Sequence, residues 1–413
     1  MAILIRGLSY GSLLIVLYAV TIVYLLYEGT RSRERFKKYN PAIRSIRQRK
    51  IILAFNWWEQ LTMASNNLLG LTALAAYGER QVVVPFVENS RFSGTPTKNN
   101  KTLAFYYNVK ALNNKLRSHG HATLINWEGF QDVCKARLDL LVYIDYPDLK
   151  VTTNYSRSAP FYRCNDRHKT IFKGFNIGKT ICMDASLDSV QRFKNEVVMG
   201  LPCVGIFQWR GIGHWHSSAR ARFDTSHAVR NILCYRNISS LFSSKLHHIA
   251  ENFVAKHLGG FFVSVHIRTE WLLGKGLNIS DLVKCISFLS ARVQSIRDKI
   301  GRATPVFLAA DFAEFGSSSY EVIPVRKRSE SLKKIVAPLK PITFNPSEFK
   351  LADRGAIAIV EMEILASGNR LVVLGGGTFQ SSIVDQFLKK QKANAWKVDR
   401  LSCQSLTGSR HVC

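Results

Sequence analysis

Apolar runs and amphipathic stretches alternate along the carboxyl-terminal half of the chain. Residues 243–260 place apolar side chains at helical spacing and end in two glycines, which act as a helix stop. The following run, 261–267, is rich in β-branched and aromatic residues, as a strand buried on both faces would be. A helix over 281–301, a strand ending at Asp311, a helix over 353–367 and a strand over 370–377 follow in turn. This order of helices and strands predicts a parallel α/β domain.

Polar residues or glycines close all three predicted strands. His266, Arg268 and Glu270 close the first, Asp311 closes the second, and three glycines followed by Thr378 close the third. Ligands of parallel α/β sheets collect at the carboxyl ends of strands, and an arginine fixed there can fork two donors toward a phosphate. Glycines let the backbone approach a ligand, and Thr378 as an N-cap would begin a helix whose free amides bind anions. A surface arginine and an ordinary glycine turn are the alternative interpretations.

The sequence lacks the common motifs for binding a nucleotide or a metal ion. Gln380 stands where a GxGxxG motif has its last glycine, and no GK[ST] follows the turn. The histidines show no HExxH spacing, and the chain has no Asp-x-Asp pair. A glycosyltransferase that holds its nucleotide through a divalent ion usually needs such a carboxylate cluster. We therefore expect no metal and no cofactor, with Arg268 and helix amides neutralising an anionic donor.

The amino-terminal half predicts a further βαβ unit. A strand over 51–56 is followed by a helical pattern that stops at a glycine, and then by a second apolar strand. Fragments at 139–145 and 197–209 also have an α/β pattern, but their order in a sheet is open. Two stretches rich in turn-forming residues, 88–100 and 330–349, are expected to be loops.

Together these motifs resemble the GDP-fucose fucosyltransferases, in particular the protein O-fucosyltransferase-like group. The resemblance covers residues 240–390 and rests on VSVHIRTE, VFLAADF, AIVEMEILASGNRLVVLGGG and TFQSS, in that order. It implies a GT-B fold, in which two Rossmann-like α/β domains face a central crevice. The acceptor-side domain would span 50–240 and the GDP-fucose-binding domain 241–400. The family's glycine-rich loop after the first strand is absent here, where two tryptophans and Glu59 follow Asn56.

The resemblance also implies roles for individual residues. Arg268, with His266 in the same strand end, would bind the donor and hold its β-phosphate. Asp311 and Phe312 would face guanine. The diphosphate pocket would be lined by Thr378, Phe379, Ser381 and Ser382.

The implied reaction is a metal-independent transfer of fucose from GDP-fucose to a hydroxyl of a protein or glycan acceptor, with inversion. Arg268 and the helix start at Thr378 would stabilise the negative charge that grows on the β-phosphate. The catalytic base stays open between Glu59, Glu270 and substrate-assisted proton loss, because a glutamate at a helix start, such as Glu59, also stabilises the helix dipole.

Two other functions remain open. One is another lumenal transferase with an anionic donor, such as a sulfotransferase, although we find no phosphate loop after the first strand. The other is a non-catalytic, membrane-anchored glycan-binding protein on a transferase scaffold, which the missing glycine loop near Asn56 allows.

The amino terminus predicts a membrane segment. Residues 8–27 carry no charge, and 20 residues are enough to cross the hydrocarbon core of a bilayer. A cleaved signal peptide is the rival interpretation, but the run is long and no small-x-small cleavage site follows. We expect a cytoplasmic tail over 1–7, a transmembrane anchor over 8–27 and a basic stem over 28–49. The Cys-containing tail would be 401–413.

The charges beside the predicted anchor conflict with the sequence beyond it. Basic residues between 31 and 38 would keep the following domain in the cytosol under the positive-inside rule. Eight cysteines and four Asn-x-Ser/Thr acceptors favour the lumen instead. The predicted glycosylation sites are Asn100, Asn154, Asn237 and Asn278. The cysteines, the glycosylation sites and the family resemblance together lead us to expect a single-pass protein of the Golgi or endoplasmic reticulum membrane with a lumenal catalytic domain.

The net charge of +28 bears on the partners of the protein. It would attract anionic molecules such as nucleotide sugars, acidic glycans and lipid headgroups. Nucleic acid is not expected as a partner of a chain with a secretory anchor.

Overall fold

The computed structural model describes residues 49–57, 61–145, 174–184, 200–209, 241–312, 323–391 and 397–401, with the single residues 164, 172 and 403. The chain divides between Arg49 and Lys50, and every helix and strand below belongs to the unit Lys50–Cys413. Within the described ranges, no helix is both long and apolar enough to cross a membrane. The predicted anchor at 8–27 lies outside these ranges.

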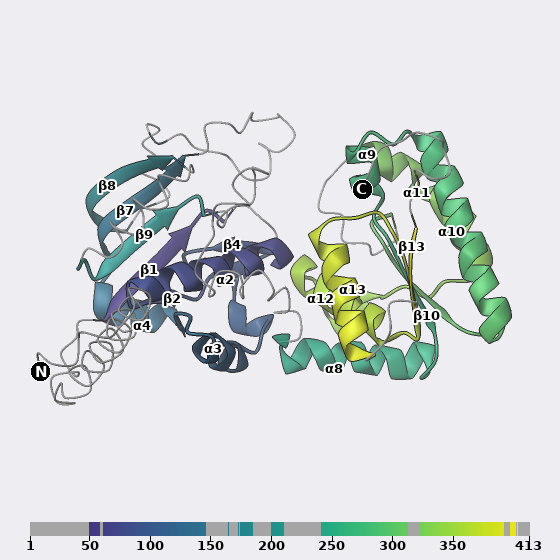
Figure 1. The fold of residues 1–413 in the computed structure, drawn as a ribbon, viewed down its shortest axis with the longest axis horizontal. Helices are drawn as coiled ribbons and strands as arrows, with labels where there is room; N and C mark the ends of the chain where they lie inside the picture. The colour runs from purple at the N-terminus through teal and green to yellow at the C-terminus, as the bar shows by residue number, and fades with distance from the viewer. Residues whose placement is uncertain are drawn as a thin grey trace, which may run out of the picture. The chain divides into compact units, whose positions relative to one another are not determined.

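Six parallel strands form the first sheet (Figure 1). They are β1 (Lys50–Phe55), β2 (Arg80–Val83), β6 (Leu124–Ile125), β7 (Arg137–Asp145), β8 (Asn176–Asp184) and β9 (Cys203–Phe207), in the order β6-β2-β1-β9-β7-β8. The central strands β1 and β9 are buried almost throughout, which explains their continuous apolar runs. Helix α2 (Leu61–Tyr77) lies between β1 and β2 in the chain, and the two strands pair in parallel. The predicted βαβ unit is therefore confirmed. The fragments predicted at 139–145 and 197–209 contribute β7 and β9 to the same sheet.

A small antiparallel sheet lies within a region that the sequence led us to expect as a loop. It consists of β3 (Phe86–Glu88), β4 (Arg91–Ser93) and β5 (Lys101–Thr102), followed by the short helix η2 (Leu103–Phe105). Asn89 and Ser90 form the β3–β4 turn and both have positive φ. The loop expectation for 88–100 was thus wrong at β4, where Phe92 is buried in the core. Helices α3 (Val109–Ser118) and α4 (Trp127–Cys134) follow, each capped by an asparagine side chain.

Four parallel strands form the second sheet, in the order β11-β10-β12-β13. They are β10 (Val263–Ile267), β11 (Val306–Ala310), β12 (Arg370–Leu374) and β13 (Val398–Leu401). The helices are α8 (Ser244–Phe253), which continues as the π-helical turn η5 (Val254–Leu258), α9 (Thr269–Gly274), α10 (Ile279–Ile300), α11 (Ile323–Val336), α12 (Arg354–Ser367) and α13 (Thr378–Lys390). The predicted order of helices and strands in this half is confirmed.

Helices cover both faces of the second sheet (Figure 1). Val263, Val265 and Ile267 point to one face and pack in a core with buried residues of α10. The alternate residues of β10, Ser264 and His266, are also buried, and His266 contacts α13 on the other face. Strand β10 therefore alternates apolar and polar residues, yet all five are buried because helices cover both faces of the sheet.

The stretch 330–349 was also expected to be a loop, and that expectation was wrong. Helix α11 extends to Val336, and two short 3-10 helices follow, η6 (Ala337–Leu339) and η7 (Pro346–Phe349). Leu332, Val336 and Leu339 are buried in the core against the sheet. The segment was expected to be a loop because it is rich in lysine, although its apolar residues are spaced as the buried stripe of a helix.

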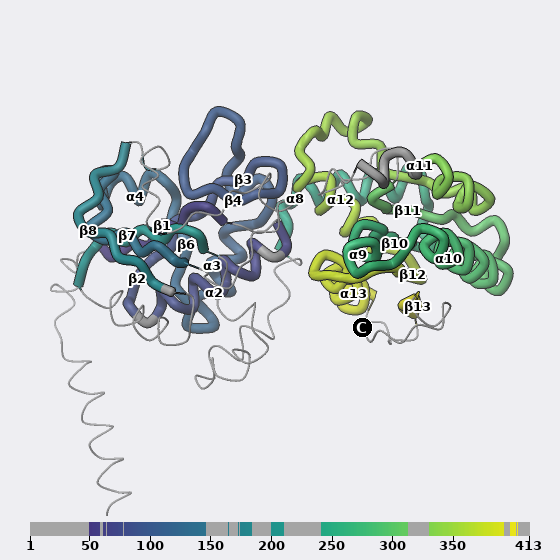
Figure 2. Tube along the Cα trace, turned by 90° about the horizontal axis from the view of Figure 1, so that it is seen from above, coloured from purple at the N-terminus to yellow at the C-terminus, as the bar shows by residue number. Residues whose placement is uncertain are grey.

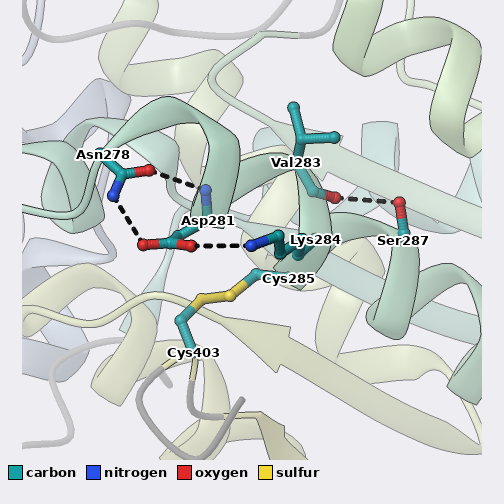
Figure 3. Close-up of a disulfide and its surroundings, with 7 residues drawn as sticks. All are labelled: Asn278, Asp281, Val283, Lys284, Cys285, Ser287 and Cys403. Carbon is teal, nitrogen blue, oxygen red and sulfur yellow. Dashed lines mark hydrogen bonds and ion pairs between the residues drawn. A yellow bond between two sulfur atoms is a disulfide. The ribbon is translucent and has the colours of Figure 1, made fainter. Parts of the chain in front are cut away.

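Three disulfides join the described cysteines: Cys134–Cys203, Cys164–Cys182 and Cys285–Cys403. Figure 3 shows the third, which ties α10 to the residue two positions after β13. Arg292 of α10 also forms an ion pair with Asp399 of β13, at 2.6 Å. The edge strand β13 is therefore held by its pairing with β12 and by two further links to α10.

Candidate functional site

The carboxyl ends of β10, β11 and β12 meet at one edge of the second sheet. Ile267 is paired with Ala310 on one side and with Leu374 on the other, so the next residue of each strand lies at the same level. Arg268, Asp311 and Gly375 are those residues. Figure 2 views the sheet from this side, with α9 over the end of β10. The convergence of the three strand ends, expected from the sequence, is thus present in the fold.

Arg268 is fixed by the glycine turn after β12. Its main-chain N–H donates to the Leu374 carbonyl at 2.9 Å, and its guanidinium Nη1 donates to the Gly376 carbonyl at 3.3 Å. A Cβ on Gly377 would lie 2.5 Å from Nη1, and one on Gly375 would lie 2.9 Å from the Arg268 carbonyl oxygen. Both glycines also have positive φ. The turn is therefore glycine-rich because Arg268 occupies the space that side chains would need.

Trp271 is a site residue that sequence reasoning missed. A Cβ on Gly376 would lie 2.7 Å from the Trp271 ring, so the indole packs directly on the glycine turn. The side chain is partly exposed, and Lys275 Nζ lies 5.8 Å from the centre of the ring. A partly exposed indole beside a guanidinium offers a flat apolar surface together with a positive charge. Its place one helical turn after Arg268 was the signal in the sequence.

Asp311 contacts the start of α9. One carboxylate oxygen accepts from Thr269 Oγ1 at 2.7 Å, and the other accepts from the Glu270 N–H at 2.8 Å. Burial raises the pKa of Asp311, while these hydrogen bonds and the charge of Arg268 oppose the rise. Phe312, expected beside guanine, is 3% exposed and packs in the core of the second sheet, so it leaves little surface for a base.

His266 lies beneath the site and is buried. Its Nδ1 is 3.3 Å from Gln380 Oε1, and its ring centre is 5.6 Å from that of Phe379, on α13. Burial, with the nearby charge of Arg268, lowers the pKa of His266 to about 4. The imidazole is therefore neutral at physiological pH and links β10 to the first turn of α13. The sequence indicated only that Gln380 replaces the last glycine of a GxGxxG motif, and it gave no sign of this contact with His266.

The start of α13 differs by one residue from the prediction. Gly377 is the N-cap and Thr378 is the first helical residue, so the prediction of Thr378 as N-cap was wrong. Gly377 has φ of 90°, a conformation that threonine would adopt only under strain. Ser381 is exposed in the first turn, whereas Ser382 is buried and donates its hydroxyl hydrogen to the Thr378 carbonyl. The first amides of the helix have no acceptor within it and face the same strand edge.

The remaining predicted residues give a partial picture. Glu59, Asn154 and Asn237 lie outside the described residues. Glu270 is 9% exposed, and its N–H is held by Asp311. Among the described residues, no group of three or more His, Cys, Asp or Glu side chains is placed to hold a metal ion.

The described fold is similar to that of POFUT1, a protein of known structure. A POFUT1 crystal structure without ligand aligns with a TM-score of 0.51 at 12% identity, covering 86% of this chain and 98% of that chain. POFUT1 in complex with GDP-fucose aligns with a TM-score of 0.49 at 12% identity, covering 86% of this chain and 98% of that chain. The NodZ alpha-1,6-fucosyltransferase co-crystallized with GDP aligns with a TM-score of 0.34 at 13% identity, covering 81% of this chain and 91% of that chain. The sequence matches no family model and no curated protein. The likeness therefore concerns the fold, which is fucosyltransferase-like and built on parallel α/β sheets.

Proposed function

We propose that this protein transfers fucose from GDP-fucose to a hydroxyl group of a protein or glycan acceptor. The observation that carries the proposal is the placement of Arg268 at the strand edge. Its guanidinium lies against the glycine turn that leads into α13, so a side-chain cation and a helix start are presented together. That combination suits a diphosphate leaving group. The fucosyltransferase-like fold supports fucose as the transferred sugar.

The chemistry would be a single displacement with inversion. An acceptor hydroxyl attacks the anomeric carbon, the bond to the β-phosphate oxygen breaks, and GDP leaves with the bonding electron pair. Arg268 and the first amides of α13 stabilise the charge that develops on the phosphate. No metal ion is needed in this scheme, because the positive charge comes from the protein. The acceptor hydroxyl loses its proton to Glu59, to Glu270 or to the substrate itself.

The location of the enzyme is a further part of the proposal. Residues 8–27 would anchor it in the Golgi or endoplasmic reticulum membrane, with the domain after residue 49 in the lumen and the two sheets facing a crevice that admits donor and acceptor. Three disulfides among the described cysteines support an oxidising compartment, because disulfides rarely persist in the cytosol.

The function is tested with the full chain, purified in detergent from a eukaryotic host. We expect titration calorimetry to show GDP binding, and GDP-fucose to be hydrolysed slowly without an acceptor, in the presence of EDTA as in its absence. Arg268→Ala should lower turnover by about two to three orders of magnitude, the usual effect of deleting one transition-state donor. Arg268→Lys should restore it only in part, since a point charge replaces a fork.

Arg302→Ala is the matched control. Arg302 is 84% exposed and lies before β11, at the opposite end of the strand from Asp311, so its loss should leave turnover unchanged. Absence of GDP binding by the wild-type protein would overturn the proposal. Binding of a phosphosulfate nucleotide in place of GDP would favour the sulfotransferase alternative, and binding of GDP without any hydrolysis or transfer would favour the non-catalytic one.

A further inference from the structure

Arg268 occupies the N-cap position of α9 but does not cap the helix. No side-chain cap hydrogen bond is made by Arg268, whose guanidinium instead reaches the Gly376 carbonyl. The first turn of α9 still needs acceptors for its amides. Asp311, the first residue after the neighbouring strand β11, supplies one by accepting from the Glu270 N–H at 2.8 Å.

Asp311 holds the same turn through a second contact. Its other carboxylate oxygen accepts from Thr269 Oγ1 at 2.7 Å, and Thr269 is fully buried. The main chain also connects the two strands, since the Asp311 N–H donates to the Ile267 carbonyl at 3.4 Å. The two residues that follow Arg268 are therefore both attached to one carboxylate.

Arg268 is fixed on the other side by β12. Its N–H donates to the Leu374 carbonyl at 2.9 Å, and the glycine turn leaves only enough room for its side chain. The arginine is thus held from β12 through its main chain, and the two residues that follow it are held from β11 by the Asp311 carboxylate. Small errors in the placement of a charged donor cost catalysis disproportionately, because charge stabilisation depends on a preorganised geometry.

We propose that Asp311 is a positioning residue for Arg268, whose carboxylate fixes the β10–α9 turn and with it the direction of the guanidinium. The catalytic consequence rests on the proposed function, but the fixed turn does not. This role differs from direct contact with the guanine base, which the family resemblance implies for Asp311. Both carboxylate oxygens are already occupied by protein donors.

The first test measures the turn itself and requires no activity. In the full-length protein, Asp311→Ala should raise hydrogen–deuterium exchange in the peptide covering 268–278, while the body of α10 keeps its protection. Asp311→Asn should stay close to wild type, because an amide can accept from Glu270 N–H and donate to the Thr269 hydroxyl. Thr269→Val should give an intermediate increase, and Thr269→Ser should give none. Unchanged exchange in Asp311→Ala would overturn the proposal even if the protein bound no GDP.

The second test asks whether Asp311 acts through Arg268. Asp311→Ala should lower turnover of GDP-fucose by about tenfold to a hundredfold, in the range expected for a misplaced catalytic group. In an Arg268→Ala background the same substitution should cost less than threefold, because the group that it positions is gone. The preference for GDP over ADP in binding should not change in Asp311→Asn.

Other results would indicate that Asp311 contacts the guanine base directly and does not act through Arg268. Equal losses from Asp311→Ala in both backgrounds, or a reduced GDP preference in Asp311→Asn, would assign Asp311 to the nucleotide and overturn the positioning role. Wild-type protein that binds no GDP would end the proposed function, and the exchange measurement would still decide whether Asp311 fixes the turn.

Discussion

Two buried ionisable residues near the second sheet have pKa values displaced in the direction that leaves each neutral. Burial raises the pKa of Glu361 on α12 from 4.5 to about 8. Burial, with the charge of Arg268, lowers the pKa of His266 from 6.5 to about 4. Each group is uncharged in the folded protein at neutral pH but titrates near its ordinary value when unfolded. Their effects on stability therefore have opposite signs.

Glu361 should make the protein less stable as pH rises. Between pH 4.5 and about 8 the unfolded state is ionised at this carboxyl and the folded state keeps its proton, so the unfolded state binds fewer protons. We expect Glu361→Gln to raise the thermal midpoint at pH 8 relative to wild type and to change it much less at pH 5. Glu330→Gln, an exposed glutamate on α11, is the control. A stabilisation equal at both pH values would contradict the buried neutral carboxyl.

His266 should have the reverse effect. Below pH 6.5 the unfolded state gains a proton that the folded state refuses until about pH 4, so stability is lost as pH falls through this window. The thermal midpoint of His266→Gln should therefore decrease less between pH 6.5 and pH 4.5 than that of the wild-type protein. The exposed His248, changed to Gln, should leave the slope as it is. A steeper loss in His266→Gln would show that the imidazole is charged in the folded protein.

The position of Arg268 could be inferred from sequence, but its surroundings could not. An apolar run that stops at an arginine shows where a buried strand ends, and this needs only local pattern. The contact of Thr269 with Asp311 joins residues 42 positions apart, and that of His266 with Gln380 joins residues 114 apart. Such pairs depend on which strands become neighbours in the sheet. A single sequence predicts that the strand ends meet, but it does not specify which side chains there come into contact.

At the scale of elements, the glycine turn between β12 and α13 is explained by what packs against it. Gly375, Gly376 and Gly377 would all clash with Arg268 or Trp271 if they carried a Cβ. The three glycines had been interpreted as room for a ligand, whereas they first make room for two side chains of the protein. Any ligand at this edge would meet the guanidinium and the indole.

Gly377→Ala tests this explanation. The new Cβ would lie 2.5 Å from Arg268 Nη1, and φ of 90° is strained for alanine, at a cost on the order of 1–3 kcal/mol. We expect a lower thermal midpoint and a loss of turnover that approaches that of Arg268→Ala. Gly260→Ala is the matched control, since its Cβ would have no atom within 4 Å. Full activity in Gly377→Ala would mean that Arg268 adopts another position without consequence.

Elements with strong periodicity were predictable, and those with mixed composition were not. Helices α10 and α12 and strand β10 follow their apolar patterns to within two residues of the predicted bounds. Strand β4 and the end of α11 were not predicted, because the stretches that contain them, 88–100 and 330–349, are rich in turn-forming and charged residues. Burial of Phe92 and Leu332, which decides the structure there, depends on partners elsewhere in the chain.

For the whole molecule, the proposed lumenal location makes a prediction about Asn278. This residue is exposed, and its Oδ1 accepts from the Asp281 N–H as the N-cap of α10 (Figure 3). Attachment of a glycan through Nδ2 would leave that acceptor in place. We expect endoglycosidase treatment of protein from a eukaryotic host to reduce its mass, and Ser280→Ala to remove one glycan without disturbing the cap.

A reporter sequon appended after residue 413 is the control for this experiment. If the reporter carries a glycan and Asn278 does not, the prediction for that site is wrong while the lumenal location stands. If neither is modified and added protease digests the domain in intact vesicles, the domain is cytosolic.

The disulfide between Cys285 and Cys403 can form only late in synthesis of the chain. The two cysteines are 118 residues apart. At about 5–20 residues per second, Cys285 emerges on the order of ten seconds before its partner. Strand β12 is made late in that interval, and its edge then stays uncovered until β13 follows; an uncovered edge is prone to pairing with other chains. In the proposed lumenal location, we therefore expect folding of the nascent protein to benefit from a thiol–disulfide isomerase and from chaperones until β13 has been made and the pair can close.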